Sequence, residues 1–447
     1  MRFLCGSLVN RRVGRNVFAN ELSAVNNTMR ILQVYNEYRT YGGEDTVVRL
    51  EADMLRQHGH QVELLHASTK ELDEAGLLRL VAAGFGTAWS FRGYSMMKKA
   101  IARFSPDIIH VHNTFPLLSP SVFWAADRAG VPVVQTLHNY RLTCANSLLL
   151  REDRPCQECV GHFPWSALRH RCFGSSFLRT AAVTGTNVIH RWLGTYRSKV
   201  HAFIVLTEFS REILVRAGLP RERIRVKPNF SPPLVSLTSP RVRRFVFAGI
   251  IARFKGVHLL LEAWARVASA GHQLLIVGDG PDRMELERRF AAQANIVWHG
   301  KQSRQETMDL IAGSRWLVSP SLAYENFPMS VLEALSAGTP VIVPNHGAFN
   351  SIVSDGVEGL AFSAGDADSL ATALQAALDA SEGAWIQWSA NARNKHVSAY
   401  SASTNYAQLM SIYREAMESF QRTRVRAHSP EIAEAAGPIA KEHVREH

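Results

Sequence analysis

Short apolar segments alternate with helical patterns along most of this 447-residue chain, and this alternation restricts the fold more than any other feature. The apolar segments form two series, at 31–34, 62–66, 108–112, 133–138 and 202–207, and then at 245–249, 274–277, 296–298, 316–319 and 341–343. Short buried strands separated by helices predict parallel β-α-β units with helices on both faces of the sheet. Two such series predict an α/β protein with two doubly wound, Rossmann-like domains. Ligands of such sheets bind beyond the carboxyl ends of the strands, so we expect the site in the cleft between the halves.

The stretch that separates the two series has the composition of a linker. Residues 227–244 contain four prolines and several basic residues, which favours an interdomain connection. We therefore predict the following division: an N-terminal extension at 1–28, an N-terminal domain at 29–230, a linker at 231–244, a C-terminal domain at 245–395, a helix at 396–420 and a tail at 421–447.

Composition limits the kind of partner and the compartment. A net charge of +11 and a pI of 9.6 favour an anionic partner, which leaves nucleic acid, a phosphorylated metabolite and an anionic membrane surface open. No run approaches the roughly 20 apolar residues of a spanning helix. Five cysteines in a long chain without a convincing secretory signal indicate a reducing compartment, so we expect a cytoplasmic protein.

Two carboxylates near a predicted helix start are the strongest chemical signal. Glu325 lies in the loop after the strand at 316–319, and Glu333 stands eight residues later, on the helix that Pro328 is expected to begin. The amino end of a helix attracts phosphate through its free N–H groups and its dipole. A loop carboxylate accepts hydrogen bonds from sugar hydroxyls, and a helical one from a ribose. The alternative is that both carboxylates only complement the helix dipole.

This segment resembles the Glu-x7-Glu motif of retaining glycosyltransferase family 4 (glycosyl transferases group 1), and the resemblance extends from about Met29 to Glu418. It implies the GT-B fold, a nucleotide-sugar donor (a UDP- or GDP-sugar) on the C-terminal half and an acceptor on the N-terminal half. It also implies that Glu325 holds the donor sugar and Glu333 the ribose, within a donor-binding segment that includes Asn326, Phe327 and Pro328.

Further loops match the family at positions expected to contact the donor. Lys255 follows the strand at 245–249 and can neutralise a diphosphate. The family's Arg, directly after the first Gly, is replaced here by Ile250, and Arg253 lies three residues later. Gly42 and Gly43 resemble the family's Gly-Gly loop near the donor phosphate. The resemblance also implies that His138 lies against the transferred sugar, where we expect it to orient the sugar or to stabilise the transition state. Because Lys255 and the helix dipole supply positive charge, we expect no catalytic metal.

Four cysteines form a separate cluster with the spacing Cys-x11-Cys-x2-Cys-x12-Cys, at Cys144, Cys156, Cys159 and Cys172. Four thiolates around a Cys-x2-Cys centre suit a structural, tetrahedral zinc ion. We therefore expect a zinc knuckle at 144–172, in which His162 or His170 can replace one ligand. Two disulfides or unrelated buried thiols are the alternatives.

Basic and aromatic residues mix in the segment 89–104, which suits peripheral contact with an anionic membrane; the alternative is an amphipathic helix with a solvated basic face. The sequence thus predicts a retaining glycosyltransferase that moves a hexose from a nucleotide sugar to a glycan or lipid-linked oligosaccharide in polysaccharide biosynthesis, at the inner face of the plasma membrane. A sugar-nucleotide epimerase and a degenerate, non-catalytic relative are the alternatives. Nucleic-acid binding is disfavoured, because the basic residues are spread along the chain.

Overall fold

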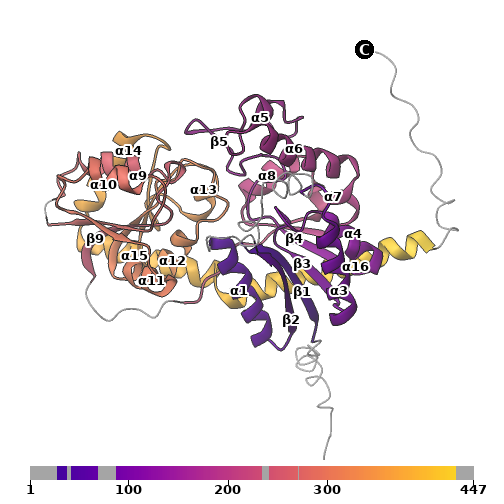
Figure 1. Cartoon of the computed structure of the whole chain (residues 1–447). Helices are drawn as coiled ribbons and strands as arrows, with labels where there is room; N and C mark the ends of the chain where they lie inside the picture. The colour runs from indigo at the N-terminus through magenta and orange to yellow at the C-terminus, as the bar shows by residue number, and fades with distance from the viewer. Residues whose placement is uncertain (1–27, 38–41, 69–86, 234–240, 270, 429–447) are drawn as a thin grey trace, which may run out of the picture.

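The computed structural model describes residues 28–37, 42–68, 87–233, 241–269 and 271–428. These residues form two α/β halves, each around its own six-stranded parallel sheet, with the N-terminal half at the right of Figure 1 and the C-terminal half at the left. Residues 1–27 of the predicted extension (1–28), residues 234–240 of the predicted linker and residues 429–447 of the predicted tail lie outside the described residues.

The N-terminal sheet has the strand order β2-β1-β3-β4-β7-β8. Its central strands are buried along their whole length, as expected of a parallel sheet covered by helices on both faces. The strands are β1 (Arg30–Glu37), β2 (Gln61–Ser68), β3 (Ile108–Val111), β4 (Val133–Thr136), β7 (Ala202–Val205) and β8 (Ile224–Val226). The helices of this half are α1 (Gly43–Gln57), α3 (Phe91–Phe104), α4 (Ser121–Ala129), α5 (Trp165–Arg169), α6 (Phe177–Trp192), α7 (Thr195–Ser198), α8 (Glu208–Arg216) and the 3-10 helix η2 (Arg221–Arg223).

The C-terminal sheet has the order β11-β10-β9-β12-β13-β14. Its order reverses between β9 and β12, and the loops that follow these two strands carry Lys255 and Glu325. The strands are β9 (Val242–Ala248), β10 (Gln273–Val277), β11 (Ile296–Gly300), β12 (Ser314–Val318), β13 (Val341–Pro344) and β14 (Gly359–Phe362). The helices are η3 (Arg253–Lys255), α9 (Val257–Trp264), α10 (Arg283–Arg289), α11 (Arg304–Ala312), α12 (Met329–Ala337), α13 (Phe349–Ile352), α14 (Ala367–Leu378) and α15 (Glu382–Ala399).

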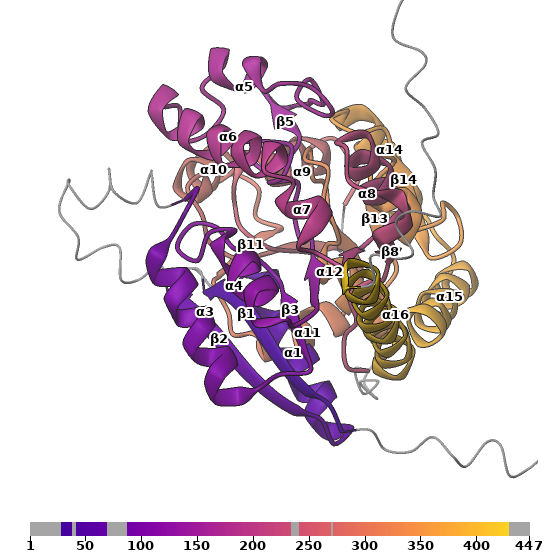
Figure 2. The same cartoon turned by 90° about the vertical axis from the view of Figure 1, so that its right-hand side faces the viewer.

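The last helix, α16 (Ala402–His428), returns to the N-terminal half. Its buried residues Leu409 and Tyr413 share a core cluster with Ile31 and Ile204 of the N-terminal sheet, and Figures 1 and 2 show α16 running along that half. The helix predicted at 396–420 is wrong at both ends, because α15 ends at Ala399 and α16 continues to His428. Residues 421–425 are exposed, so no apolar core pattern marks the end of α16 in the sequence.

The sequence pattern did not predict two edge strands, β8 and β14, and it placed the start of β9 three residues too late. β8 and β14 lie at the edges of their sheets, and Arg225 interrupts the apolar run of β8. Edge strands are covered less completely than central ones, so their apolar pattern is weaker. β9 begins at Val242, inside the segment predicted as linker. None of the described helices combines the length and the apolar character needed to cross a bilayer.

A short hairpin carries part of the cysteine segment towards the C-terminal half. Its strands are β5 (Leu150–Arg151) and β6 (Arg154–Pro155), and it lies at the top of Figure 1, between the halves. Leu150 packs with Leu322 and Phe254 of the C-terminal half. The two halves are therefore in contact through this hairpin.

Candidate functional site

Lys255 and Glu325 meet where the order of the C-terminal sheet reverses. The ammonium of Lys255 lies 2.7 Å from Oε1 of Glu325, and the Ser321 hydroxyl donates to the same oxygen, also at 2.7 Å. The two loops pass closely at Gly256, which has φ +71°, and a Cβ there would stand 2.0 Å from the Pro320 carbonyl oxygen. Only glycine fits this position, so the backbone itself brings the two charged residues together.

The pairing keeps Glu325 ionised although its side chain is largely removed from solvent. Burial alone would raise the pKa of its carboxyl, but the charge of Lys255 and the hydrogen bonds from Lys255 and Ser321 outweigh burial and lower that pKa below its ordinary value. The site thus holds one carboxylate and one ammonium side by side. When a ligand binds, the carboxylate can accept hydrogen bonds from hydroxyl groups, and the ammonium can contact a phosphate.

Glu333 lies on the second turn of α12, nearly buried, and pairs with Arg304 at 3.2 Å. Burial raises the pKa of Glu333, and Arg304 opposes this rise. Arg304 is the first residue of α11 and lies far from the motif in the sequence, so no sequence pattern predicted it as a site residue. The sequence shows only a basic residue in a segment expected to be helical. It does not show which carboxylate this residue contacts.

Two residues predicted to bind the donor use their side chains elsewhere. The amide of Asn326 donates to the Leu137 carbonyl at 2.8 Å and also contacts the Ser210 hydroxyl, both in the N-terminal half. Phe327 is buried in the C-terminal core, with its ring 5.5 Å from that of Tyr400. The backbone is therefore the part of Asn326 and Phe327 that stays available to a ligand. Pro328 precedes α12, as expected.

The Gly-Gly loop of the N-terminal half faces the start of α12. Gly42 and Gly43 lead into α1, and a Cβ on Gly43 would stand 3.2 Å from Cγ of Met329, the first residue of α12. Glu44, next in the chain, accepts a hydrogen bond from Asn113, and burial raises its pKa to about 8. Both halves thus meet at the amino end of α12.

Arg253 does not join Lys255 in the structure. Its Nε lies 2.6 Å from Asp153, at the turn of the β5–β6 hairpin. Ile250, which occupies the position of the arginine in the resemblance, is exposed. Of the two basic residues predicted to contact phosphate, Lys255 is the one that the fold places beside Glu325.

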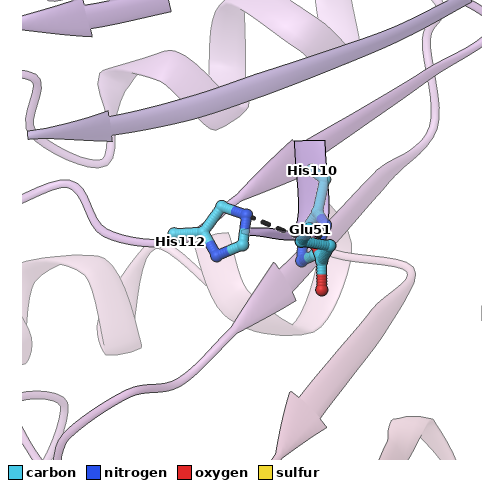
Figure 3. Close-up of side chains that lie close together, drawn as sticks. All are labelled: Glu51, His110 and His112. Carbon is cyan, nitrogen blue, oxygen red and sulfur yellow. Dashed lines mark ion pairs between the residues drawn. The ribbon is translucent and has the colours of Figure 1, made fainter. Parts of the chain in front are cut away.

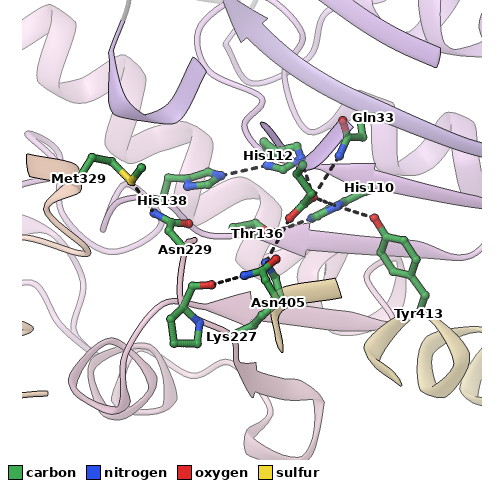
Figure 4. Close-up of polar contacts among 12 residues, drawn as sticks. Gln33, His110, His112, Thr136, His138, Lys227, Asn229, Met329, Asn405 and Tyr413 are labelled. Atoms are coloured by element: carbon green, nitrogen blue, oxygen red, sulfur yellow. Dashed lines mark hydrogen bonds and ion pairs between the residues drawn. The ribbon is translucent and has the colours of Figure 1, made fainter. Parts of the chain in front are cut away.

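His138 follows β4 and is the last member of a buried polar chain (Figure 4). Its Nε2 lies 3.0 Å from Nδ1 of His112, whose other ring nitrogen lies 3.6 Å from Glu51; Glu51 also contacts His110, at 2.9 Å. Burial lowers the pKa of His138 to about 3, so its ring is neutral at pH 7. A neutral imidazole can exchange hydrogen bonds with a sugar hydroxyl, but it does not carry a charge to the site.

Comparisons with known proteins now identify the fold and the chemistry. The family described as Glycosyltransferase Family 4 matches residues 41–231, and the family described as Glycosyl transferases group 1 matches residues 242–380. The chain belongs to glycosyltransferase family 4. The two matches correspond to the two sheets, and together they leave outside mainly β1, α15 and α16.

Individual relatives agree with this assignment. Alpha-monoglucosyldiacylglycerol synthase of Streptococcus pneumoniae is 22% identical over 339 residues, which cover 71% of each chain. Phosphatidyl-myo-inositol mannosyltransferase of Mycobacterium leprae is 22% identical over 408 residues, covering 86% of this chain and 96% of the relative. The solved structure of Anabaena HepE in complex with UDP shares the fold, with a TM-score of 0.60, 18% identity and coverage of 86% of this chain and 99% of that one. The predicted GT-B fold is confirmed, and this family 4 protein is a glycosyltransferase that uses a nucleotide sugar.

One group in the glycosyltransferase has the composition of a metal site but a different electrostatic role (Figure 3). Glu51, His110 and His112 are the only described residues of which three or more potential ligand atoms lie within 4.8 Å of one another. However, the buried ammonium of Lys227 lies 3.1 Å from Glu51, and the ring nitrogens of His110 bond Tyr413 and Thr136. A divalent cation would be placed against Lys227. The group is better described as a charge-balanced polar core.

The four cysteines of the glycosyltransferase surround a single small cavity. Its volume is about 20 Å³, and the free thiols at positions 144, 156, 159 and 172 all line it. Burial, with a smaller contribution from the other thiols, raises the pKa of Cys172 to about 11. The sulfur atoms are not gathered to the mutual distances of a formed metal site among the described residues, so the zinc knuckle stays a prediction.

Proposed function

We propose that this glycosyltransferase transfers a hexose from a UDP- or GDP-sugar, with retention of the anomeric configuration, to a glycan or a lipid-linked oligosaccharide in polysaccharide biosynthesis. The observation that carries the proposal is the Lys255–Glu325 pair in the loops that precede α9 and α12. The Gly42–Gly43 loop approaches Met329, the first residue of α12. This arrangement offers positive charge to a diphosphate and hydrogen-bond acceptors to a sugar within one site.

The residues take separate roles in the proposed transfer. Lys255 and the amino end of α12 neutralise the diphosphate as the bond from the anomeric carbon to the phosphate oxygen breaks and its electron pair leaves with the diphosphate. Glu325 accepts hydrogen bonds from the sugar hydroxyls, and Glu333, held by Arg304, accepts those of the ribose. The acceptor hydroxyl attacks the same face, and its proton passes to the leaving phosphate. His138 orients the sugar as a neutral ring. No catalytic metal is part of this scheme.

A structural zinc ion at the four cysteines is a second part of the proposal. Four thiols around one small cavity match the ligand set of a closed zinc site, in which each sulfur stands about 2.3 Å from the metal. Elemental analysis of the purified protein should find about one zinc per chain, and Cys156→Ser should lose it while Cys5→Ser keeps it. A folded, metal-free protein would contradict the site, and a mass lower by four hydrogens would indicate two disulfides instead.

The acceptor and the location complete the proposal. The names of the two relatives described above refer to lipids, monoglucosyldiacylglycerol as a product and phosphatidyl-myo-inositol as an acceptor, which supports a lipid-linked acceptor. We place this acceptor at the inner face of the plasma membrane. A cytoplasmic location agrees with five cysteines in a chain of this length.

The proposal is tested first by thermal unfolding in the presence of UDP, GDP, ADP and their common sugar conjugates. Binding to the native state raises its melting temperature, so one nucleotide and its sugar should stabilise the protein selectively. Glu325→Gln should keep the fold and the nucleotide response but lose the additional response to the sugar. Donor binding without transfer to any acceptor would favour the degenerate alternative that Ile250 suggests, and formation of an epimer would favour the epimerase. Equal stabilisation by every nucleotide would contradict a specific donor site.

A further inference from the structure

Helix α6 has an apolar face that no other described element covers. Positions 178, 182, 185, 189 and 192 are spaced alternately four and three residues apart, so they lie on one side of the helix. Leu178, Ile189 and Trp192 on this side are 78%, 45% and 85% exposed. A Cβ at Gly185, midway along the face, would meet no atom within 4 Å. The opposite side, with Thr180 and Val183, is buried.

Neighbouring segments enlarge this apolar surface. Helix α5 packs beside α6. Its first residue, Trp165, is 68% exposed, and the centre of the exposed Phe163 ring lies 4.5 Å from the centre of the Trp165 ring. The segment before α3 meets the buried side of α6, where His190 bonds the Ala88 carbonyl at 2.6 Å. Phe91, the first residue of α3, is exposed three residues later. Figures 1 and 2 show α5 and α6 together at the outer edge of the N-terminal half.

The charge carried by the segment that forms this surface is positive, and Glu158, which contacts Ser166 of α5, is paired with Arg151. The sequence from Cys159 to Thr207 contains no Asp or Glu but has six basic residues, namely Arg169, Arg171, Arg179, Arg191, Arg197 and Lys199. Lys199 pairs with Asp127. The five arginines are exposed, and none of them has an ion-pair partner among the described residues. Elsewhere in the chain exposed arginines commonly pair, as Arg103 does with Glu63.

We propose that the α5–α6 surface docks the enzyme on an anionic lipid bilayer. Exposed Trp, Phe and Leu insert at the boundary between head groups and acyl chains, and arginines beside them attract negatively charged head groups. A second copy of this chain would bring two sets of unpaired arginines together, and repulsion between them disfavours that occupant. The α5–α6 surface is thus the part of the enzyme that would contact the membrane. The benefit of this contact, access to a lipid-linked acceptor, rests on the proposed function.

The surface differs from the segment in which the sequence suggested membrane contact. In α3, Met97, Ala100 and Ile101 are buried, and the helix packs on α4. Its apolar side therefore belongs to the core, and its basic side chains face solvent. Only Phe91, at its first position, remains available to a membrane.

The experiment measures sedimentation of the full chain with vesicles of phosphatidylcholine alone or mixed with phosphatidylglycerol. Wild type should bind the mixed vesicles, and raising the ionic strength from about 0.1 M to about 1 M should weaken binding because charges are screened more strongly. The double variant Leu178→Ser/Trp192→Ser should bind at least about tenfold more weakly. Met284→Ser provides the matched control, because Met284 is 84% exposed on α10 of the other half, and it should bind as wild type does.

Two further measurements distinguish this inference from the proposed function. Glu325→Gln should bind vesicles like wild type, and the double variant should keep its melting temperature and its response to the donor. Equal vesicle binding by wild type and the double variant, or no binding by wild type, would overturn the inference. A dimer that dissociates in the double variant would also overturn it, by assigning the surface to self-association.

Discussion

At the scale of single residues, the site depends on one half-buried ion pair. Lys255 and Glu325 follow different strands, yet the close passage at Gly256 sets them 2.7 Å apart. Lys255 keeps Glu325 ionised, so that its carboxylate can accept hydrogen bonds. In turn, Glu325 holds the ammonium of Lys255 at the position where we propose that the diphosphate binds. Arg253, three-fifths exposed and paired with Asp153, has no comparable position.

The first prediction compares these two basic residues. Lys255→Ala should reduce kcat/KM for the donor by about 10²- to 10³-fold, because it removes positive charge from the leaving diphosphate. Arg253→Ala is the matched control and should change kcat/KM by less than about threefold, because an exposed ion pair contributes little. Steady-state kinetics with the donor found by thermal unfolding measures both. An equal loss of kcat/KM in the two variants would contradict this prediction and would indicate that Arg253 also contacts the diphosphate.

At the scale of secondary-structure elements, the contact between loops is as important as the residues on them. The loops after β9 and β12 touch through η3 and Pro320, and the Gly-Gly loop before α1 touches the start of α12. These approaches need residues without side chains at the contact. A substitution there should therefore separate elements that each remain folded.

The second prediction tests the contact at Gly256. Gly256→Ala should destabilise the protein by about 2–4 kcal/mol and weaken donor binding, because its Cβ overlaps the Pro320 carbonyl and φ is positive. Gly218→Ala is the control: its φ is +94°, but nothing lies within 4 Å of the added Cβ. It should cost about 1 kcal/mol, from strain alone, and leave donor affinity unchanged. Chemical denaturation and nucleotide titration of both variants measure these effects, and equal donor affinities would contradict the proposed role of the contact.

At the scale of the whole molecule, a buried charge cluster joins distant parts of the chain. Glu51 of α1 pairs with Lys227, after β8, and Lys227 also bonds Asn405 of α16. His110, in β3, bonds Tyr413 of α16. The last helix is thereby tied to the core of the first domain and, through His112, to His138.

The third prediction concerns this cluster. Lys227→Met should lower the free energy of unfolding by about 3–5 kcal/mol, because Glu51 would be left buried and uncompensated. Adding Glu51→Gln should recover a large part of the loss, since the charge itself is then removed. Urea unfolding of the two variants measures the difference. Similar stability of the single and double variants would show that the ion pair is not the reason for the effect.

The fourth prediction is a loss of stability in mild acid. Burial lowers the pKa of His138 to about 3 and of His201 to about 4, whereas unfolded histidines titrate near 6.5. Between these values the unfolded chain binds more protons, so stability falls as pH drops below about 6.5, by up to about 1.4 kcal/mol per pH unit for each such histidine. His201→Asn, which keeps an acceptor near the Val133 amide, should reduce this slope. Melting temperatures from pH 7 to 5 measure it, and an unchanged slope would contradict the assignment to His201.

The sequence by itself determined the two parallel sheets and the two charged loops of the site. Both follow from local pattern, because apolar runs define strands, and parallel strands place the residues that follow them at one edge of the sheet. Lys255 and Glu325 were found in this way, and the family resemblance named their roles.

Only the tertiary structure decided which contacts the other site residues and the apolar helix faces make. In the structure Asn326 joins the two halves, Arg304 holds Glu333, and α16 packs on the first domain. The apolar stripe of α6 has the periodicity of a helix that packs into a core, yet the fold leaves it exposed. The spacing of apolar residues shows which side of a helix is apolar. Whether that side is buried depends on elements that are distant in the sequence and pack against it only in the folded chain.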